Sequence, residues 1–314
     1  MNLKLDISDN NQSSQEDIIS KDNLINLNEL RKKAKNRMIL CIIIGVIAVL
    51  ILNILMNNIL STILTLLTIA GLGVFAVKPY MEFKTKYKEM FVQSNLEGVF
   101  DNLNYQPNIG ISRDIIKNTQ MMQMGNKYHS NDYIEADYNG VHFIQSDVCI
   151  QEETHDSENR SHTETYFRGR WMIFDFNKEF KANVQVVQNG FKHAKRKRLF
   201  GKEEEKYKKV EMEDVTFNKE FKIFAQNEHD AFYILTPQMM ERIRNIANNI
   251  DGYLILCFID NNLHVGIHTN RDSFEPSMMK EIDPEVEKQK IINDINLITT
   301  FVNDLSLDTK LFKA

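Results

Sequence analysis

Residues 38–77 read MILCIIIGVIAVLILNILMNNILSTILTLLTIAGLGVFAV and contain no charged residue. As one helix this stretch would be about 60 Å long at 1.5 Å per residue, twice the roughly 30 Å hydrocarbon core of a bilayer. Asn57 and Asn58 lie at its midpoint, and asparagine suits a turn because it tolerates left-handed backbone geometry. The sequence therefore predicts a transmembrane helical hairpin with spans 38–56 and 59–77.

Basic residues on both sides of the hairpin predict its orientation. Five precede the first span and four follow the second, while the connection between the spans carries no charge. Basic flanks stay in the cytoplasm, so we expect an integral membrane protein with both termini on the cytoplasmic side. The membrane-flank basic residues are Arg31, Lys32, Lys33, Lys35, Arg37, Lys78, Lys84, Lys86 and Lys88. Pro79 predicts a kink or break just past the second span.

Three other interpretations of the apolar block agree less well with the sequence. A cleaved signal peptide needs a shorter apolar core and a small-residue cleavage site, and neither is seen. A buried helix pair of a soluble protein would show polar positions at helical spacing. A re-entrant loop would span nothing. Length and flanks favour the two-span hairpin over all three.

Charge and cysteine content exclude several broad classes. The net charge of −5 gives no general attraction to nucleic acid or to an anionic membrane, so no nucleic-acid partner is expected. Cys41, Cys149 and Cys257 are too scattered for a disulfide framework or a zinc site. Reduced thiols in a protein that faces the cytosol are the simplest interpretation.

The remaining sequence divides by composition and periodicity. Residues 1–22 are rich in Asn, Asp, Ser and Gln and predict a mobile polar tail. A basic juxtamembrane helix is expected at 23–37, the hairpin at 38–77 and a juxtamembrane helical region at 78–127. Phe83, Tyr87 and Phe91 share a helical face there, and the helix is expected to reach about Leu103.

Residues 128–314 are predicted to form a cytoplasmic α+β domain with a mostly antiparallel sheet and packed helices. Asn139-Gly140, between two alternating runs, is the strongest β-hairpin signal. Thr236-Pro237 predicts a helix start, with threonine as N-cap and proline at the first position. The second strand of a long hairpin is expected at 163–176, and further strands at 184–187, 221–225, 253–259 and 263–268. A last helix is expected to begin at Asp283-Pro284.

Several ordered motifs resemble one bacterial family. They are Asp132-Tyr-Ile-Glu135, Phe167-Arg-Gly-Arg-Trp171 followed by Asp175-Phe-Asn-Lys178 and Phe180, then Phe221-Lys-Ile-Phe224 and Ala231-Phe-Tyr-Ile-Leu-Thr-Pro237. With the preceding hairpin, they resemble the domain-of-unknown-function 3137 family over roughly residues 28–305. The resemblance implies a membrane-associated protein of the bacterial cell membrane with a cytoplasmic domain. The family has no established catalytic residues that could be assigned to positions of this sequence.

Candidate chemical sites are few. His142, His155 and His162, with Cys149 on the same strand, invite a metal interpretation, but loop histidines in solvent explain them better because metal sites need rigid ligands. Asp132, Glu135, Asp175 and Lys178 are the chemically attractive polar residues, although carboxylates beside strand ends usually cap turns. No cofactor-binding fingerprint or nucleophile motif occurs. No cofactor, metal or catalytic residue is therefore assigned.

A dense basic run follows the strand expected at 184–187. In a tethered domain it could contact anionic lipid head groups or an unidentified protein, at about 1 kcal/mol per basic residue near a membrane. An acidic triplet at 203–205 would offset part of that attraction, so a solvated loop is the favoured interpretation of the run. The run comprises Lys192, Lys195, Arg196, Lys197 and Arg198.

Two functional hypotheses follow. The favoured one is a membrane-anchored binding or scaffold module that faces the cytoplasm, with the lipid bilayer and a protein or lipid as partners. The alternative is a membrane-bound enzyme of unrecognised type, with a carboxylate and lysine site in the α+β domain. An enzyme requires those side chains to converge in one concave pocket, whereas a binding module does not.

Overall fold

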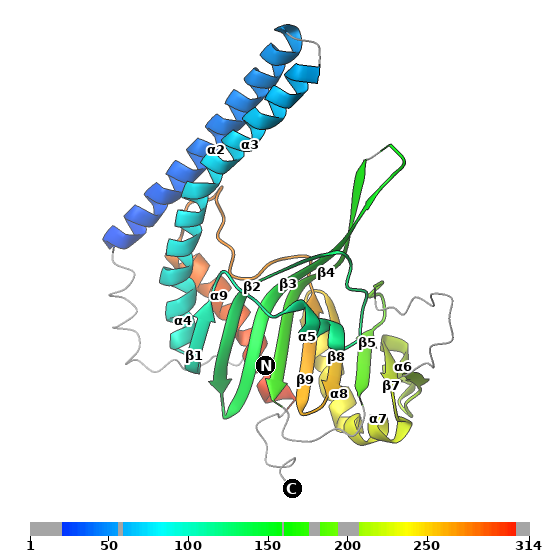
Figure 1. The fold of residues 1–314 in the computed structure, drawn as a ribbon. Helices are drawn as coiled ribbons and strands as arrows, with labels where there is room; N and C mark the ends of the chain where they lie inside the picture. Colours follow the sequence, from blue (N-terminus) through cyan, green and yellow to red (C-terminus); the bar gives the residue numbers. More distant parts are fainter. Residues whose placement is uncertain (1–20, 56–58, 159, 176–182, 194–206, 306–314) are drawn as a thin grey trace. The chain divides into compact units, whose positions relative to one another are not determined.

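The structure, a computed structural model, describes residues 21–55, 59–158, 160–175, 183–193 and 207–305 (Figure 1). The chain divides into two compact units. The helical unit comprises residues 1–98 and 274–292, and the sheet unit comprises residues 99–273 and 293–314. The predicted polar tail at 1–22 lies outside the described residues except for its last two positions.

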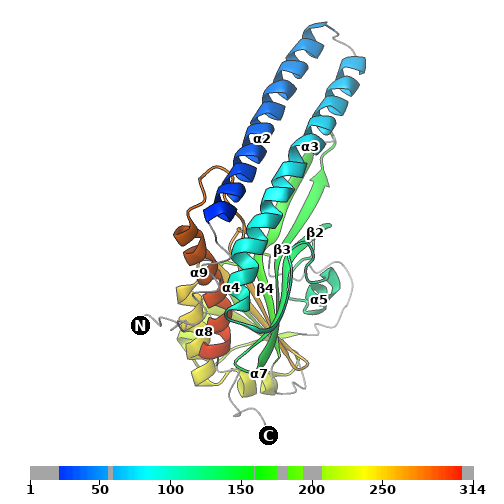
Figure 2. The same ribbon diagram turned by 90° about the vertical axis from the view of Figure 1, so that its left-hand side faces the viewer.

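Two long helices dominate the helical unit and pack side by side (Figures 1 and 2). The basic helix expected at 23–37 and the first span form one continuous helix, α2. The second span continues through Pro79 without the predicted break, so the hydrogen bond that proline removes does not end the helix. The elements are α2 (Lys21–Leu55), α3 (Ile59–Tyr87), the π-helix η1 (Lys88–Gln93), α4 (Ser94–Glu97) and the first half of α9 (Pro284–Asp304).

Both long helices are candidate membrane spans by length and composition, over Asp22–Leu52 and Thr62–Glu97. Their apolar side chains between residues 39 and 77 are mostly exposed, and Ile54 is 81% exposed. Water disfavours an apolar surface of this extent.

An aromatic ladder continues α3 into the packed end of the helical unit. Phe83, Tyr87 and Phe91 follow one another at four-residue spacing and are fully buried, with ring centroids 6.5 Å and 5.3 Å apart. The Tyr87 hydroxyl donates a 2.5 Å hydrogen bond to Oε2 of Glu287. This face of α3 and η1 therefore forms part of the core of the helical unit. The helix predicted to reach about Leu103 ends at Glu97, and Leu103 lies in a strand.

The sheet unit contains a nine-stranded sheet in which every pair of neighbours is antiparallel. This confirms the predicted α+β class. The strand order is β1-β2-β3-β4-β9-β8-β5-β7-β6. The strands are β1 (Asp101–Gln106), β2 (Lys127–Tyr138), β3 (Val141–His155), β4 (Ser161–Asp175), β5 (Val184–Gln188), β6 (Lys208–Val210), β7 (Phe221–Ala225), β8 (Tyr253–Ile259) and β9 (Asn262–His268).

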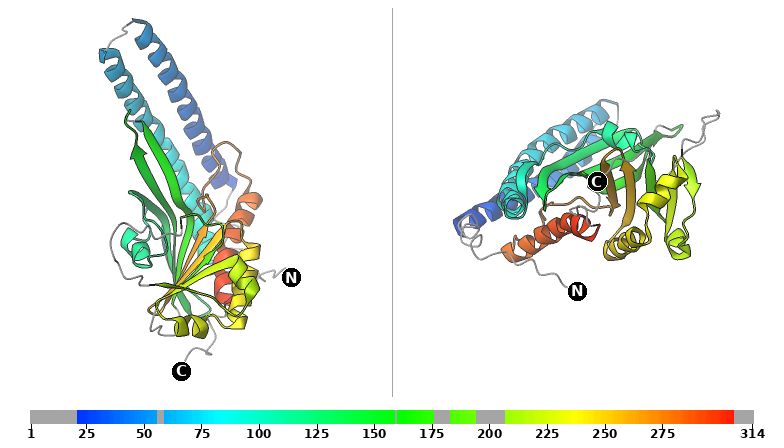
Figure 3. Two further views of the ribbon diagram at one scale, coloured as in Figure 1. Left: turned by 90° about the vertical axis from the view of Figure 1, so that its right-hand side faces the viewer. Right: turned by 90° about the horizontal axis from the view of Figure 1, so that it is seen from below.

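Helices cover both faces of this sheet. One face carries α5, and the other carries α8 and the second half of α9 (Figures 2 and 3). On the α5 side, Trp171 is fully buried among apolar side chains, as expected for a core residue. On the α9 side, Phe174 stacks on Phe301 with centroids 6.1 Å apart. The helices are α5 (Arg113–Asn118), α6 (Val215–Glu220), α7 (Glu228–Ile234) and α8 (Pro237–Asn249).

The strongest local sequence signals are confirmed. Asn139 and Gly140 both have positive φ, 50° and 75°, as a two-residue β-hairpin turn requires. The Thr236 side chain accepts a hydrogen bond from the Met239 amide at 3.2 Å, which makes it the N-cap of α8. The strand pair β3–β4 extends beyond its neighbours as a two-stranded ribbon (Figure 1).

Candidate functional sites

Three of the nine membrane-flank basic residues, Arg31, Lys84 and Lys88, have partners in the segment 274–292 of the helical unit, while Lys86 pairs with Glu89 one turn away. Arg31 is 4% exposed and donates to Oδ1 of Asn28 and to the Met278 carbonyl oxygen, at 3.2 Å and 3.3 Å. Lys84 and Lys88 both pair with Glu275, at 2.6 Å and 3.2 Å, and Lys88 is 1% exposed. Arg31 and Lys88 are therefore structural residues. The exposed flank charges are Lys32, Lys33, Lys78 and Lys86, with Arg37 and Lys35 half-buried.

Asp132 is a buried structural carboxylate in the sheet unit. It accepts hydrogen bonds from the Tyr105 hydroxyl at 2.7 Å and from Nδ2 of Asn131 at 2.6 Å. Its φ of 55° lies in the left-handed region, and the strand β2 shifts register there. The side chain thus stabilises an irregular point in the strand and is fully buried.

Glu135 lies three residues further along β2 and is half-buried. Its Oε2 accepts from Nδ2 of Asn104 at 3.3 Å and from the Tyr133 hydroxyl at 3.2 Å. Burial and this carboxylate together raise the pKa of Tyr133. His142 approaches from β3, with its Nε2 3.7 Å from Oε1 of Glu135. Glu135 is therefore paired across the sheet surface and is not part of the pocket described next.

A polar pocket of about 360 Å³ lies at the turn end of β2 and β3, which we call the acidic pocket. His142 Nδ1 is 2.9 Å from Oδ1 of Asp137, and Nδ2 of Asn102 donates to Asp137 Oδ2 at 2.6 Å. These hydrogen bonds, from Asn102 first and His142 second, lower the pKa of Asp137. The lining residues are Asp101, Asn102, Asp137, Gly140, Val141, His142 and Asp175.

The acidic pocket has the chemistry to accept hydrogen bonds from a cationic or amide group. Among the nominated residues that the structure describes, Asp175, at the end of β4, is the one that lines it. Asp132 and Glu135 lie elsewhere in the sheet unit, and Lys178 lies outside the described residues. The described members of the nominated set are thus not brought together.

The metal interpretation gains no geometric support. Within residues 21–55, 59–158, 160–175, 183–193 and 207–305, no group of three or more His, Cys, Asp and Glu side chains is placed to hold a metal ion. His155 and His162 are exposed in the β3–β4 ribbon. Burial raises the pKa of the Cys149 thiol, which disfavours the thiolate that metals bind.

The basic run is only partly described. Lys192 is exposed just after β5, while Lys195, Arg196, Lys197 and Arg198 lie outside the described residues. His193, next to Lys192, stacks on Tyr166 with ring centroids 4.8 Å apart, and its Nε2 is 3.8 Å from Oε1 of Glu164. The start of the run is therefore attached to the sheet unit beside an acidic side chain.

One polar cluster was missed by the sequence analysis. Asp147 is 1% exposed on β3 and faces Arg170 on β4, which is 4% exposed. Arg170 donates to Ser273 Oγ at 2.7 Å and 2.9 Å and pairs with Asp294 at 2.7 Å. The Ser273 amide donates to Asp147.

Burial raises the pKa of Asp147 to about 8, and the neighbouring Asp132 adds to the effect while Arg170 opposes it. The carboxyl group is therefore neutral over much of the physiological range. The polar triplet Gln145-Ser146-Asp147, in the middle of an apolar strand, is the sequence signal that points to such a cluster.

Comparisons with known proteins give one distant fold likeness and one family. No curated protein sequence matches the chain. The crystal structure of the mycobacterial trehalose monomycolate transport factor A, TtfA, is similar with 8% sequence identity and a TM-score of 0.36. That likeness covers 70% of this chain and 94% of the TtfA chain, and it is too distant to bear on function.

The family match covers most of β4, the strands β5 to β9 and the helices α6 to α9. It begins within β4 and ends beyond α9, so it contains the Phe167–Trp171 and Phe221–Phe224 motifs but not the hairpin or Asp132–Glu135. The predicted family is confirmed by this match: residues 165–307 match the family described as Protein of unknown function (DUF3137).

Proposed function

We propose that the protein is a membrane-anchored binding or scaffold module that holds its sheet unit in the cytoplasm of a bacterial cell. The observation that carries the proposal is the exposed apolar surface of α2 and α3, two paired helices each long enough to span a bilayer. A helix pair of a soluble protein would bury that surface inside the protein, whereas in a membrane the lipid acyl chains would cover it.

The charge distribution supports both termini lying in the cytoplasm. No Asp or Glu occurs between residues 30 and 81, whereas six basic residues flank the apolar block within that range. Even with Arg31 buried, exposed lysines remain beside each span. Such flanks are retained on the cytoplasmic side.

The polar side chains support binding over catalysis. The enzyme alternative named Asp132, Glu135, Asp175 and Lys178, and the three that are described have different surroundings. Asp132 is sequestered by Tyr105 and Asn131, which leaves it without access to a substrate. A well-patterned domain with scattered polar residues suits a surface that binds a protein or lipid head group.

Alkaline carbonate extraction of membranes that contain the full-length protein tests the anchor. We expect the wild-type protein to stay in the pellet. The variant Ile47→Lys/Leu67→Lys should be released, because each lysine at a span centre costs about 3 kcal/mol. The control variant Val215→Lys/Phe232→Lys changes exposed apolar residues of the sheet unit and should stay in the pellet. Release of the wild-type protein would contradict the proposal.

Affinity purification of the intact protein from its native membrane tests the binding role. A binding or scaffold module should retain a specific protein or anionic lipid at constant stoichiometry. Charge reversal at Lys195, Arg196, Lys197 and Arg198 should reduce that retention if the basic run is the contact. Purification without any stoichiometric companion would contradict a scaffold role.

A further inference from the structure

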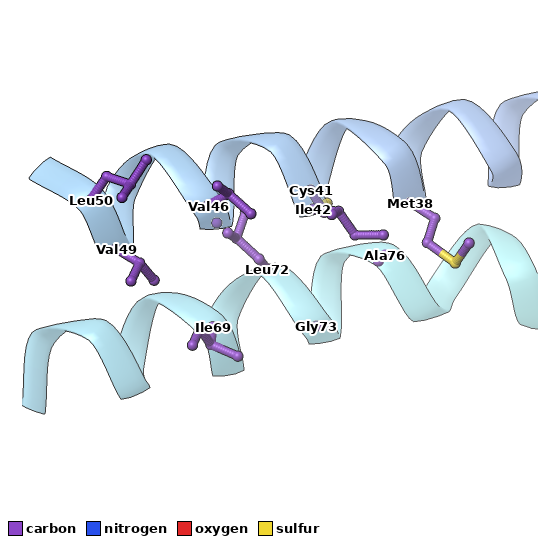
Figure 4. A pocket seen from close by; sticks show the side chains of 11 residues that line it. Met38, Cys41, Ile42, Val46, Val49, Leu50, Ile69, Leu72, Gly73 and Ala76 are labelled. Atoms are coloured by element: carbon purple, nitrogen blue, oxygen red, sulfur yellow. The ribbon is translucent and has the colours of Figure 1, made fainter. Parts of the chain in front are cut away.

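An apolar groove lies between the two long helices of the helical unit. It encloses about 450 Å³, within the roughly 300–1,000 Å³ that is usual for small-molecule pockets. Figure 4 shows the side chains of Met38 and Leu72 extending into the space between α2 and α3. Six of its lining residues are Met38, Cys41, Val46, Ile69, Leu72 and Gly73.

Two glycines keep this groove open, because glycine has no side chain. A Cβ atom added at Gly73 would meet nothing within 4 Å, and one at Gly45 would meet Leu72 Cδ1 at 3.6 Å. Glycines in membrane helices usually let two backbones approach closely. Here the space at Gly73 is not closed by the opposite helix, so it is available to another apolar group.

The length and direction of the groove fit one leaflet of a bilayer. Along α2 it runs from Met38 to Leu50, which is about 18 Å at 1.5 Å per residue. Half of the hydrocarbon core is about 15 Å. The groove therefore begins at the basic end of the hairpin and ends near the middle of the membrane.

Positive charge lies at the basic end. The Arg37 guanidinium is 4.5 Å from the centre of the Phe75 ring, next to the lining residues Met38 and Ala76. Lys78 is exposed two residues beyond Ala76. No acidic residue occurs between positions 30 and 81 to neutralise these charges locally.

We propose that the groove binds one acyl chain of an anionic phospholipid, whose phosphate lies beside Arg37 and Lys78. The apolar lining recognises the chain, the depth matches a single leaflet, and the basic end selects a negative head group. This inference rests on the proposed membrane insertion of the hairpin.

Photolabelling of the full-length protein in vesicles tests the site. The probe is phosphatidylglycerol with a diazirine on its acyl chain, compared with the same probe on phosphatidylcholine. We expect phosphatidylglycerol to label Val46 and Leu72 severalfold more than the outward-facing Ile43 and Ile47. Arg37→Gln/Lys78→Gln should lower that labelling to the phosphatidylcholine level.

Two glycine variants provide a matched pair. Gly73→Leu fills the groove and should lower labelling of Val46 severalfold. Gly71→Leu makes the same change two residues away. A Cβ atom at position 71 also meets nothing within 4 Å, but Gly71 does not line the groove, so this variant should leave the labelling of Val46 unchanged.

Three results would overturn the inference. Equal labelling of lining and outward-facing residues, or equal effects of the two glycine variants, would mean that lipid only surrounds the hairpin. Crosslinks between two hairpins at Val46 or Leu72, in place of lipid adducts, would identify a second copy as the occupant. Loss of the wild-type protein from carbonate-washed vesicles would instead refute membrane insertion, and this site with it.

Discussion

Asp147 shows how a single buried carboxyl group can make stability depend on pH. Its Oδ1 accepts no hydrogen bond within the described part of the chain, and Arg170 is shared with Ser273 and Asp294. A buried carboxylate in this position is costly unless it is fully paired. Keeping a proton at neutral pH removes the charge.

The pKa of Asp147 predicts a specific pH dependence. Because the folded pKa of about 8 exceeds the ordinary value of 3.8, the folded state holds a proton that the unfolded chain releases between these limits. This group therefore lowers the free energy of unfolding as pH rises from about 4 to 8. Asp147→Asn removes this titration. The free energy of unfolding of the variant, relative to that of the wild-type protein, should therefore increase steadily as pH rises from about 4 to 8.

Denaturant unfolding of the full-length protein in detergent, followed by Trp171 fluorescence, measures this difference. Ser146→Ala is the matched control, because it changes a buried, uncharged neighbour on β3 and should alter stability by the same amount at every pH. A stability difference between Asp147→Asn and wild type that does not vary between pH 4 and 8 would refute the assignment.

Gly140, in the tight turn between β2 and β3, provides a second test. Its φ of 75° is unfavourable for residues with a Cβ atom, and that atom would meet nothing within 4 Å. Gly140→Ala should therefore cost about 1 kcal/mol through backbone strain alone. Asn139→Gly, at the preceding left-handed position, should change the unfolding free energy much less. If both variants lost the same free energy of unfolding, the left-handed backbone at Gly140 would not be the cause of the loss.

The acidic pocket shows why a site is harder to predict than a turn. The sequence nominated Asp175 and His142 for different reasons, and nothing local indicated that they line one pocket. Their approach depends on the pairing of β3 with both β2 and β4. Asp147 and Arg170 likewise meet only through strand register, so periodicity along one segment could not reveal them.

Helix caps provide a test at the scale of the element. Thr236 forms a side-chain cap bond to α8, whereas Ser112 at the start of α5 forms none. Thr236→Ala should lower the free energy of unfolding by about 1 kcal/mol. Ser112→Ala should cost clearly less. The same unfolding assay compares the two, and a larger loss at Ser112 would contradict the cap assignment.

Elements with a strong local signal were predicted, and those with a weak one were not. The β2–β3 hairpin, α8 and α9 have turn, cap or stripe signals and are confirmed. Strand β1 was missed because Asp101–Gln106 is mostly polar and pairs only at the edge of the sheet. Strand β6 has three residues and α6 and α7 have six and seven, too short for a periodic pattern.

The proposed role of the whole protein requires the hairpin to cross the membrane twice. The helices have the required length and composition, and their apolar side chains are exposed. The proposed anchoring, the proposed cytoplasmic position of the sheet unit and the proposed lipid binding all require that crossing.

The most direct test is the accessibility of single cysteines in intact cells stripped of their outer layers. In a protein whose Cys41, Cys149 and Cys257 are replaced by serine, one cysteine is placed at Asn57, between the spans, or at Lys78, beyond the second span. A membrane-impermeant maleimide should label position 57 from outside, and position 78 only after permeabilisation. Labelling of position 78 in intact cells, or of position 57 only after permeabilisation, would contradict the proposed topology.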